Sequence, residues 1–475
     1  MRTRFSDIPG EVVDQTKRIV LDTIGCALGG YSTEIGKMSV ALIRSLGGTP
    51  ESTVLVSGDK TSCANAAFAN TKMAYALDFD DSFLGSPHFA TLTVMASLAV
   101  SESEEATGKD FLLGVVLGYD IAARIGRAMS LHYAARTGNI EPPKVSGFSW
   151  WTFGAAAAAG KVLRLGREQM LHALGIAGAN APMPSRRKCL QYGIEGEPLP
   201  SLKYFDSGWA AQVGVTAALC ARIGFTGFPT IIDGEDGFWR MCGASECRFD
   251  LIEENLGERW YVMDSSFKPY PCCRFLHHPM YLLARLVEKH KIRPRDIKSI
   301  KVKVIPLILE SSHLLSLQPK GIIDLQFSLP YNMAMIALGR KPSPSWHSLE
   351  RLDSEVKDLM NKIVIEPSEI ASKAFAQTTE QHEFFKRIPT SIEVITRSEK
   401  FTDSTEYTKG DPWDPKTAMS NEELEDKFRT NAFHASSDSI VWKKKIEKAI
   451  EAISNLEKLK NIRDLTSLLS DAERK

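Results

Sequence analysis

The stretch "YALDFDDSFLGSPHFAT" (75–91) places Asp78, Asp80 and Asp81 within four positions, and His88 follows ten residues after the first of them. Carboxylates beside an imidazole are suited to holding and moving protons. The alanine-rich segment "SCANAAFANTKMA" immediately upstream predicts a helix that ends at these aspartates. Because a helix C-terminus carries partial negative charge, acidic side chains there are unfavourable by about a few tenths of a kcal/mol. Either the aspartates hydrogen-bond their own backbone in a solvated turn, or a site requires them.

Three further stretches contain residues able to bind anions or exchange protons. "SGFSWWTFG" (146–154) has two tryptophans before an alanine-rich helix, for which simple aromatic packing is the alternative. Lys203 in "SLKYFDSGWAAQVG" precedes an apolar helix, and it is either held near the buried helix N-terminus or extended along the surface. "SSFKPYPCCRFLHHPMY" gathers Lys268, Arg274, His277 and His278 around a turn restricted by proline.

Signatures of nucleotide, zinc and serine-hydrolase chemistry are absent from the sequence, which has no G-x-G-x-x-G after a strand, Walker A loop, H-E-x-x-H or G-x-S-x-G. Ser185 and Lys188 match S-x-x-K, but the companion motifs S-D-N and K-T-G are missing. The adjacent His277 and His278 would point apart on a helix. The sequence therefore predicts no metal and no organic cofactor.

The composition is that of an ordinary globular protein, with 475 residues and 43% hydrophobic residues. The 58 basic and 58 acidic residues give a formal net charge of zero, which removes the electrostatic argument for nucleic acid or a membrane surface as a partner. No apolar run is long enough to span a membrane, and the N-terminus lacks a signal-peptide pattern. Eight cysteines without a C-x-x-C pair favour reduced thiols and a cytoplasmic location.

Hydrophobic periodicity divides the chain into a helical and a mixed part. Residues 7 to about 240 show helical spacing, whereas 298–305, 362–367 and 390–398 alternate as half-buried strands, with helices at 278–292 and 329–341 between them. After the polar stretch 401–417 the pattern is helical again, including one amphipathic helix over 440–470. We expect a mainly α protein, in which residues 1–265 and 410–475 form a large helical domain and 266–409 an inserted α+β lid domain.

Six motifs in the same order resemble those of the MmgE/PrpD family, which includes 2-methylcitrate dehydratase, cis-aconitate decarboxylase and iminodisuccinate epimerase. They are "LDFDDSFLGSPH", "GFSWWTFG", "LKYFDSGWAAQVG", "FKPYPCCRFLHHP", "QFSLPYNMAMIALG" and "ELEDKF". The resemblance implies a helical domain built from both chain ends with an inserted lid. It also implies a cofactor-free homodimer that acts on small di- and tricarboxylates.

Carried over residue by residue, the resemblance implies that the site contains Asp78, His88, Lys203 and His277. We predict that these four catalytic residues converge in a cleft between the two domains. Asp78 would orient His88, the two histidines would act as acid and base, and Lys203 would anchor a carboxylate or act as base. None of the four is expected to fill a hydrophobic core. The implied substrate-binding residues are Ser82, Ser149, Lys268, Arg274 and Tyr331.

Position 149 departs from the family pattern. The "GFS" of this chain resembles a "GFH" in dehydratase and decarboxylase members, so serine stands where histidine is expected. The leading hypothesis is a hydro-lyase acting on a 2-methylcitrate-like or other alkylated tricarboxylate. The alternatives are an epimerase or isomerase of a small dicarboxylate, a decarboxylase, and a non-catalytic protein that binds an anionic metabolite.

Overall fold

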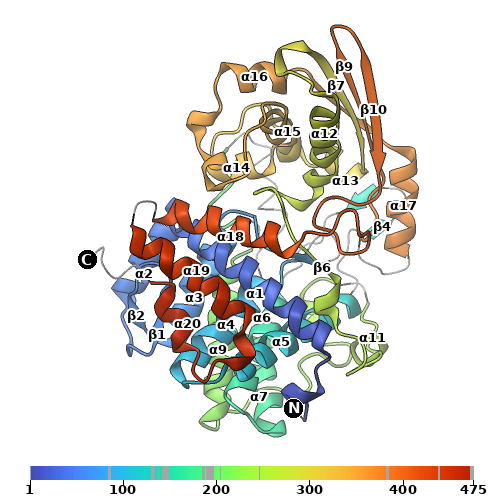
Figure 1. The fold of residues 1–475 in the computed structure, drawn as a ribbon. Helices are drawn as coiled ribbons and strands as arrows, with labels where there is room; N and C mark the ends of the chain where they lie inside the picture. The colour runs from blue at the N-terminus through green and yellow to red at the C-terminus, as the bar shows by residue number, and fades with distance from the viewer. Residues whose placement is uncertain are drawn as a thin grey trace.

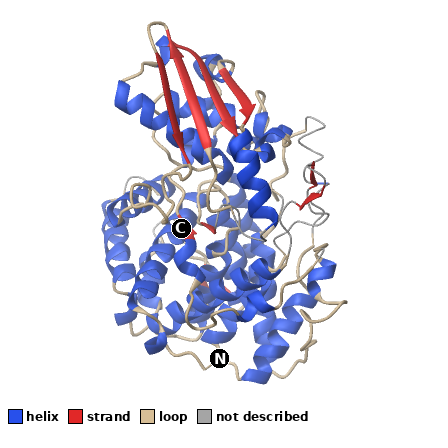
Figure 2. Ribbon diagram, turned by 90° about the vertical axis from the view of Figure 1, so that its right-hand side faces the viewer, coloured by secondary structure: helices blue, strands red, loops and turns tan. Residues whose placement is uncertain are grey.

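The computed structural model describes residues 2–83, 87–129, 134–136, 139–141, 149–183, 188, 197–203, 205–244, 246–380, 385–436 and 439–470. Parts of the motifs quoted above, including 84–86, 146–148 and 204, and Ser185 of the S-x-x-K match, lie outside these residues. Helices predominate in the described chain, as Figure 2 shows. The prediction of a mainly α protein is confirmed.

The first half of the chain forms a bundle of helices around one hydrophobic core. Glycine and alanine let these helices approach closely: a Cβ atom at Gly154 would lie 2.9 Å from the carbonyl oxygen of Gly118 on a neighbouring helix. The helices are α1 (Gly10–Tyr31), α2 (Glu34–Leu46), α3 (Cys63–Tyr75), α4 (Ala90–Ser103), α5 (Gly108–Ala128), α6 (Trp151–Val162), α7 (Arg167–Ala179), α9 (Ser207–Arg222), α10 (Phe238–Met241) and α11 (Asp250–Glu253). Short strands accompany them: β1 (Ser52–Thr53), β2 (Lys60–Thr61), β3 (Ser82–Phe83), β4 (Ala134–Arg136), β5 (Asn139–Glu141) and β6 (Ser265–Ser266).

The C-terminal segment returns to this bundle, and its side chains complete the same core. Figure 1 shows α18 (Asn421–Ala435) and α19 (Ile440–Ser454) beside α1. The single helix expected over 440–470 is wrong, because α19 ends at Ser454 and α20 (Arg463–Leu468) starts after a short connection. That connection buries Leu456 and Ile462 in the core, which one continuous helix would not do.

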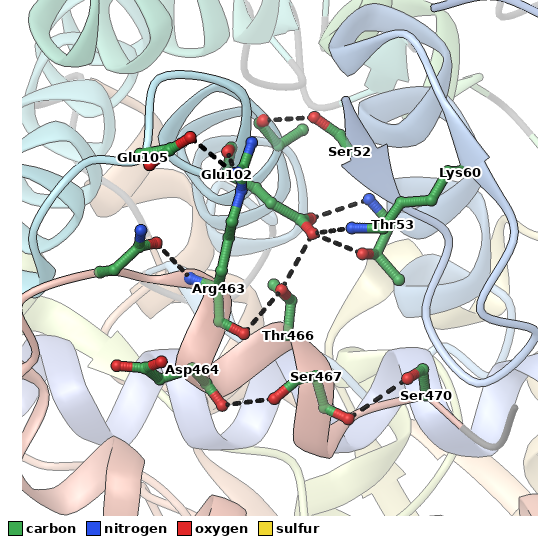
Figure 3. Close-up of polar contacts among 12 residues, drawn as sticks. Ser52, Thr53, Lys60, Glu102, Glu105, Arg463, Asp464, Thr466, Ser467 and Ser470 are labelled. Atoms are coloured by element: carbon green, nitrogen blue, oxygen red, sulfur yellow. Dashed lines mark hydrogen bonds and ion pairs between the residues drawn. The ribbon is translucent and has the colours of Figure 1, made fainter. Parts of the chain in front are cut away.

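A buried carboxylate ties the C-terminal return to the N-terminal half (Figure 3). Glu102 at the end of α4 is 1% exposed and accepts hydrogen bonds from Thr53 N at 2.8 Å and from the Thr466 hydroxyl at 3.0 Å. Lys60 pairs with the same carboxylate, and Arg463 Nε donates to the Glu102 carbonyl at 3.1 Å. Segments from β1, β2, α4 and α20 therefore meet at one side chain.

The mixed part of the chain has its own hydrophobic core and a four-stranded sheet in the order β10-β9-β7-β8. Its strands are β7 (Ile297–Val304), β8 (Ile363–Pro367), β9 (Thr390–Thr396) and β10 (Lys400–Thr405), and only the β7–β8 pair is parallel. Its helices are α12 (His277–His290), α13 (Pro306–Leu309), α14 (Ile322–Phe327), α15 (Leu329–Ala337), α16 (Ser354–Met360) and α17 (Glu369–Glu380). In Figure 2 helices lie behind the sheet. Lys301 and Glu393 are cross-strand partners on β7 and β9.

Three of the four strands match the alternation seen in the sequence, but β10 falls within the stretch interpreted as a polar connection. As an edge strand it pairs with β9 alone, and its side chains alternate between exposed and partly buried, with Phe401 packed against the second core. The exact domain boundaries, and the description of the smaller unit as a lid, stay predictions.

Candidate active site

The candidate site is built on the C-terminal end of α3, where four distant side chains donate to backbone carbonyls. Lys203 Nζ lies 2.9 Å from Tyr75 O, Gln326 Nε2 lies 2.7 Å from Ala76 O, and Lys268 Nζ lies 3.0 Å from Asp78 O. The fourth donor, Lys427 Nζ, lies 2.5 Å from Phe79 O. Three buried lysines therefore lie at the end of α3 and along the turn that follows it, which offsets the cost of placing carboxylates there.

Asp78 lies between two lysines. Its Oδ1 is 3.0 Å from Lys268 Nζ and 3.8 Å from Lys203 Nζ, and all three side chains are at most 3% exposed. Burial acts to raise the pKa of Asp78, but Lys203, Lys268 and His88 hold that pKa well below its usual range. Asp78 is therefore ionised in the folded protein.

The two lysines differ in how easily each loses a proton. Burial lowers the pKa of Lys203, and Asp78 at 3.8 Å only partly opposes it. Burial also acts to lower the pKa of Lys268, but Asp78 and Asp80 outweigh it, so this pKa is raised. The lysine closer to Asp78, Lys268 at 3.0 Å, thus has the raised pKa, and the more distant one, Lys203 at 3.8 Å, has the lowered pKa.

Asp80, and not Asp78, orients His88. The Nδ1 of His88 lies 3.0 Å from Asp80 Oδ2, while the Asp78 carboxylate is occupied by the two lysines. The role of orienter predicted for Asp78 is therefore wrong. When Nδ1–H of His88 donates to this carboxylate, Nε2 is the ring nitrogen that accepts a proton. The rings of Tyr75 and Trp151 lie 5.6 and 6.1 Å from that of His88 and enclose the pair.

The third aspartate of the motif has a structural role. Asp81 accepts hydrogen bonds from the Tyr119 hydroxyl at 3.0 Å and from Ala90 N, in the first turn of α4, at 3.2 Å. Burial, reinforced by Asp80, raises the pKa of Asp81 well above its usual range. None of the three aspartates is more than 1% exposed, so the interpretation as a solvated turn is wrong.

Asp78, Asp80 and His88 are the residues here that could hold a metal ion, since one ligand atom of each lies within 4.8 Å of the others. The two lysine ammonium groups at 3.0 and 3.8 Å from Asp78 already supply positive charge at this point. A divalent cation would be repelled by both. The residues therefore fit an anionic ligand better than a metal.

His277, at the start of α12, is fully buried, and its Nε2 lies 3.2 Å from the carbonyl oxygen of Cys272. Its Nδ1 has no hydrogen-bond partner within the described ranges. Burial, followed by Arg274 and Lys268, lowers the pKa of His277 well below its usual value. His277 is therefore neutral, and its catalytic role stays a prediction.

Arg274 and Ser82 are both buried close to the junction of the two cores. Arg274 pairs with Asp411, which also accepts a hydrogen bond of 2.8 Å from the Ser266 hydroxyl. Ser266 pairs with Ser82 across the β3–β6 ladder. The structure thus joins these two predicted substrate-binding residues through one small network.

Ser149 and Tyr331 each have a hydrogen-bond partner other than the Asp78 carboxylate. The Ser149 hydroxyl hydrogen-bonds the thiol of Cys242, whose pKa burial raises to about 12. The Tyr331 hydroxyl donates to the carbonyl oxygen of Trp346 inside the second core. Their predicted contact with substrate therefore stays a prediction.

Gln326 and His347 lie at the site, although the sequence did not single them out. Gln326 bonds Ala76 O and lies 3.4 Å from Nδ1 of His347, whose Nε2 contacts Pro271 O. Gln326 belongs to the quoted "QFSLPY" motif, which is the one signal that pointed to it. A cavity of about 210 Å³ opens beside Ala76, between the helical bundle and α14.

Two protein-family models match the chain. The model of the MmgE/PrpD N-terminal domain matches residues 1–249, and that of the MmgE/PrpD C-terminal domain matches residues 270–453. The chain therefore belongs to the MmgE/PrpD family. It is 28% identical to cis-aconitate decarboxylase from Homo sapiens, over 98% of this chain and 92% of that protein. It is 26% identical to cis-aconitate decarboxylase from Aspergillus terreus, over 98% and 93% of the two chains. Within the described residues, no helix combines the length and apolar character needed to cross a membrane.

Proposed function

We propose that the protein is a lyase that removes carbon dioxide or water from a small di- or tricarboxylate without a cofactor. The observation that carries this proposal is one ionised carboxylate between two buried lysines, next to a buried Asp80–His88 pair. Negative charge that develops on a substrate carboxylate during bond cleavage needs fixed cations nearby, and Lys268 meets that need. Lys203 or Nε2 of His88 then donates or accepts the proton.

Decarboxylation of a cis-aconitate-like acid is the first candidate reaction, since the decarboxylases named above are aligned over nearly the whole chain. Loss of carbon dioxide leaves an electron pair that is delocalised onto a neighbouring carboxylate, and a proton completes the product. Dehydration of a 2-methylcitrate-like acid, the leading hypothesis from the sequence, needs the same cation and a base. The two reactions differ in which group leaves.

Epimerisation of a small dicarboxylate is a second candidate function, which Ser149 favours. A serine bonded to Cys242 is a weaker proton donor than the histidine expected there. Removal and return of one proton, without a leaving group, requires less acid catalysis than departure of water.

We also propose a homodimer, as the resemblance implies.

NMR of the purified protein with a panel of citrate-like and succinate-like acids in deuterated water separates these functions. Released carbon dioxide with a product one carboxyl group shorter indicates the decarboxylase, and a new olefin with all carbons retained indicates the dehydratase. Deuterium uptake without loss of mass indicates the epimerase. Tight binding without any of these changes would contradict the lyase proposal and favour a metabolite-binding protein.

A further inference from the structure

The "ELEDKF" motif on α18 contributes one side chain to the acidic turn, although α18 lies about 350 residues away in the sequence. Lys427 is 8% exposed, and its Nζ lies 2.5 Å from Phe79 O and 4.0 Å from the centre of the Phe79 ring. The same Nζ lies 2.6 Å from Oδ1 of Asp22 on α1. Lys427 thus links α18, near the C-terminus, and α1, near the N-terminus, to Phe79, which lies between Asp78 and Asp80.

The Phe79 peptide sets the relative direction of two carboxylates with different tasks. Asp78 faces Lys268 and Lys203, whereas Asp80 faces His88. Asp78 has a φ of 52°, in the left-handed region that a residue with a side chain adopts only at an energetic cost. Such a conformation persists only where its surroundings fix it. Lys268 and Lys427 do this by donating to the consecutive carbonyls of Asp78 and Phe79.

Close packing between α1 and α18 leaves Lys427 little freedom to move. A Cβ atom at Gly25 would lie 3.0 Å from Cδ2 and 3.2 Å from Cα of Phe428, the residue after Lys427. Asp22 lies on the same helix as Gly25 and supplies the opposite charge. The ammonium group is therefore held at the turn by backbone packing as well as by its ion pair.

We propose that Lys427 is a positioning residue, which fixes the Phe79 carbonyl and thereby the mutual orientation of Asp78 and Asp80. The C-terminal helix α18 would then be needed for turnover as well as for stability. The rate part of this inference rests on the proposed function, whereas the part about the turn does not.

Three variants separate positioning from simple charge pairing: Asp22→Asn, Lys427→Met and the double variant. Each single variant leaves one buried charge unpaired and should lower the urea midpoint, and the double variant should recover much of that loss. If Lys427 positions the turn, Asp22→Asn keeps kcat within about threefold of wild type. The double variant then loses kcat at least about tenfold, with a smaller change in KM, because Phe79 O has lost its donor. Recovery of both stability and kcat in the double variant overturns the proposal.

Amide hydrogen exchange measured by mass spectrometry gives a second readout that does not depend on turnover. A peptide covering 74–83 should exchange faster in the double variant than in Asp22→Asn, while a control peptide from α7 should not change. Equal exchange in the two variants overturns the proposal even if the wild type turns over none of the acids. Lys427→Arg retains a charged donor, so it should keep slow exchange and at least about a tenth of the wild-type kcat. Loss of both with the fold intact contradicts the inference.

Discussion

Replacing Lys203 by methionine tests the division of roles between the two lysines. Lys203→Met keeps the length of the side chain but removes the 2.9 Å hydrogen bond to Tyr75 O and the cation 3.8 Å from Asp78. It also removes the contact of Nζ with the Tyr75 ring, 4.3 Å from the ring centre. Lys268 remains 3.0 Å from Asp78, so the carboxylate is not left without a partner.

The size of the effect follows from these distances. A charge 3.8 Å from Asp78 attracts it by about 4 kcal/mol at an effective dielectric constant near 20, and a charge-assisted hydrogen bond contributes about 1.5–3 kcal/mol. Burying the ammonium group of Lys203 costs free energy on folding. The methionine variant avoids that cost, which offsets part of the lost attraction. We therefore expect a loss of about 2 kcal/mol in the free energy of unfolding. In the transition state the lost hydrogen bond corresponds to a rate reduced about 10- to 100-fold.

The assay combines urea unfolding at pH 7 with kcat and KM measured well below the unfolding midpoint. Lys268→Met is the matched control: it loses two 3.0 Å hydrogen bonds to Asp78, so its urea midpoint should fall further. Wild-type kcat in Lys203→Met would refute the assignment of Lys203 to the reaction. An unchanged urea midpoint would refute the electrostatic reasoning.

Three more predictions follow from individual contacts. Burial lowers the pKa of His347 from 6.5 to about 4, so the unfolded state binds more protons between these values and stability is lost as the pH falls. His347→Gln should therefore reduce the loss of unfolding free energy between pH 7 and pH 5 by about 2 kcal/mol, measured by urea titration at both pH values. Glu102→Gln should cost about 2 kcal/mol of stability, because the buried hydrogen bonds to this side chain weaken, while Lys60 is partly exposed and stays hydrated. We expect kcat to be unchanged. Asp80→Asn should lower kcat at least about tenfold with a smaller change in KM, because His88 loses the carboxylate that orients it; wild-type kcat would exclude that role.

Much of the fold follows from local patterns. The alternation of Ile300, Val302 and Val304 with lysines marks β7, and Gly/Ala-rich segments mark the close-packed helices. The edge strand β10 has no comparable sequence pattern. Its pairing with β9 at the edge of the sheet, and not its hydrophobicity, makes it a strand. The break between α19 and α20 likewise depends on burying Leu456 against distant residues.

The site could be predicted only in part, for a similar reason. Motifs identified Asp78, His88 and Lys203, but which aspartate bonds His88 depends on where Lys268 and Lys203 lie in three dimensions. The four catalytic candidates lie outside the hydrophobic cores, as expected, but each is at most 3% exposed, so their replacement affects stability as well as rate.

The measurement that tests the central claim most directly is NMR of the wild type and of Asp78→Asn with cis-aconitate and 2-methylcitrate in deuterated water, after circular dichroism has shown both proteins folded. We expect the wild type to release carbon dioxide or water from at least one acid, and Asp78→Asn to do so at least about tenfold more slowly, since it no longer ion-pairs with Lys268. A folded wild type that leaves both acids unchanged, or an Asp78→Asn variant with the wild-type rate, would contradict the central claim.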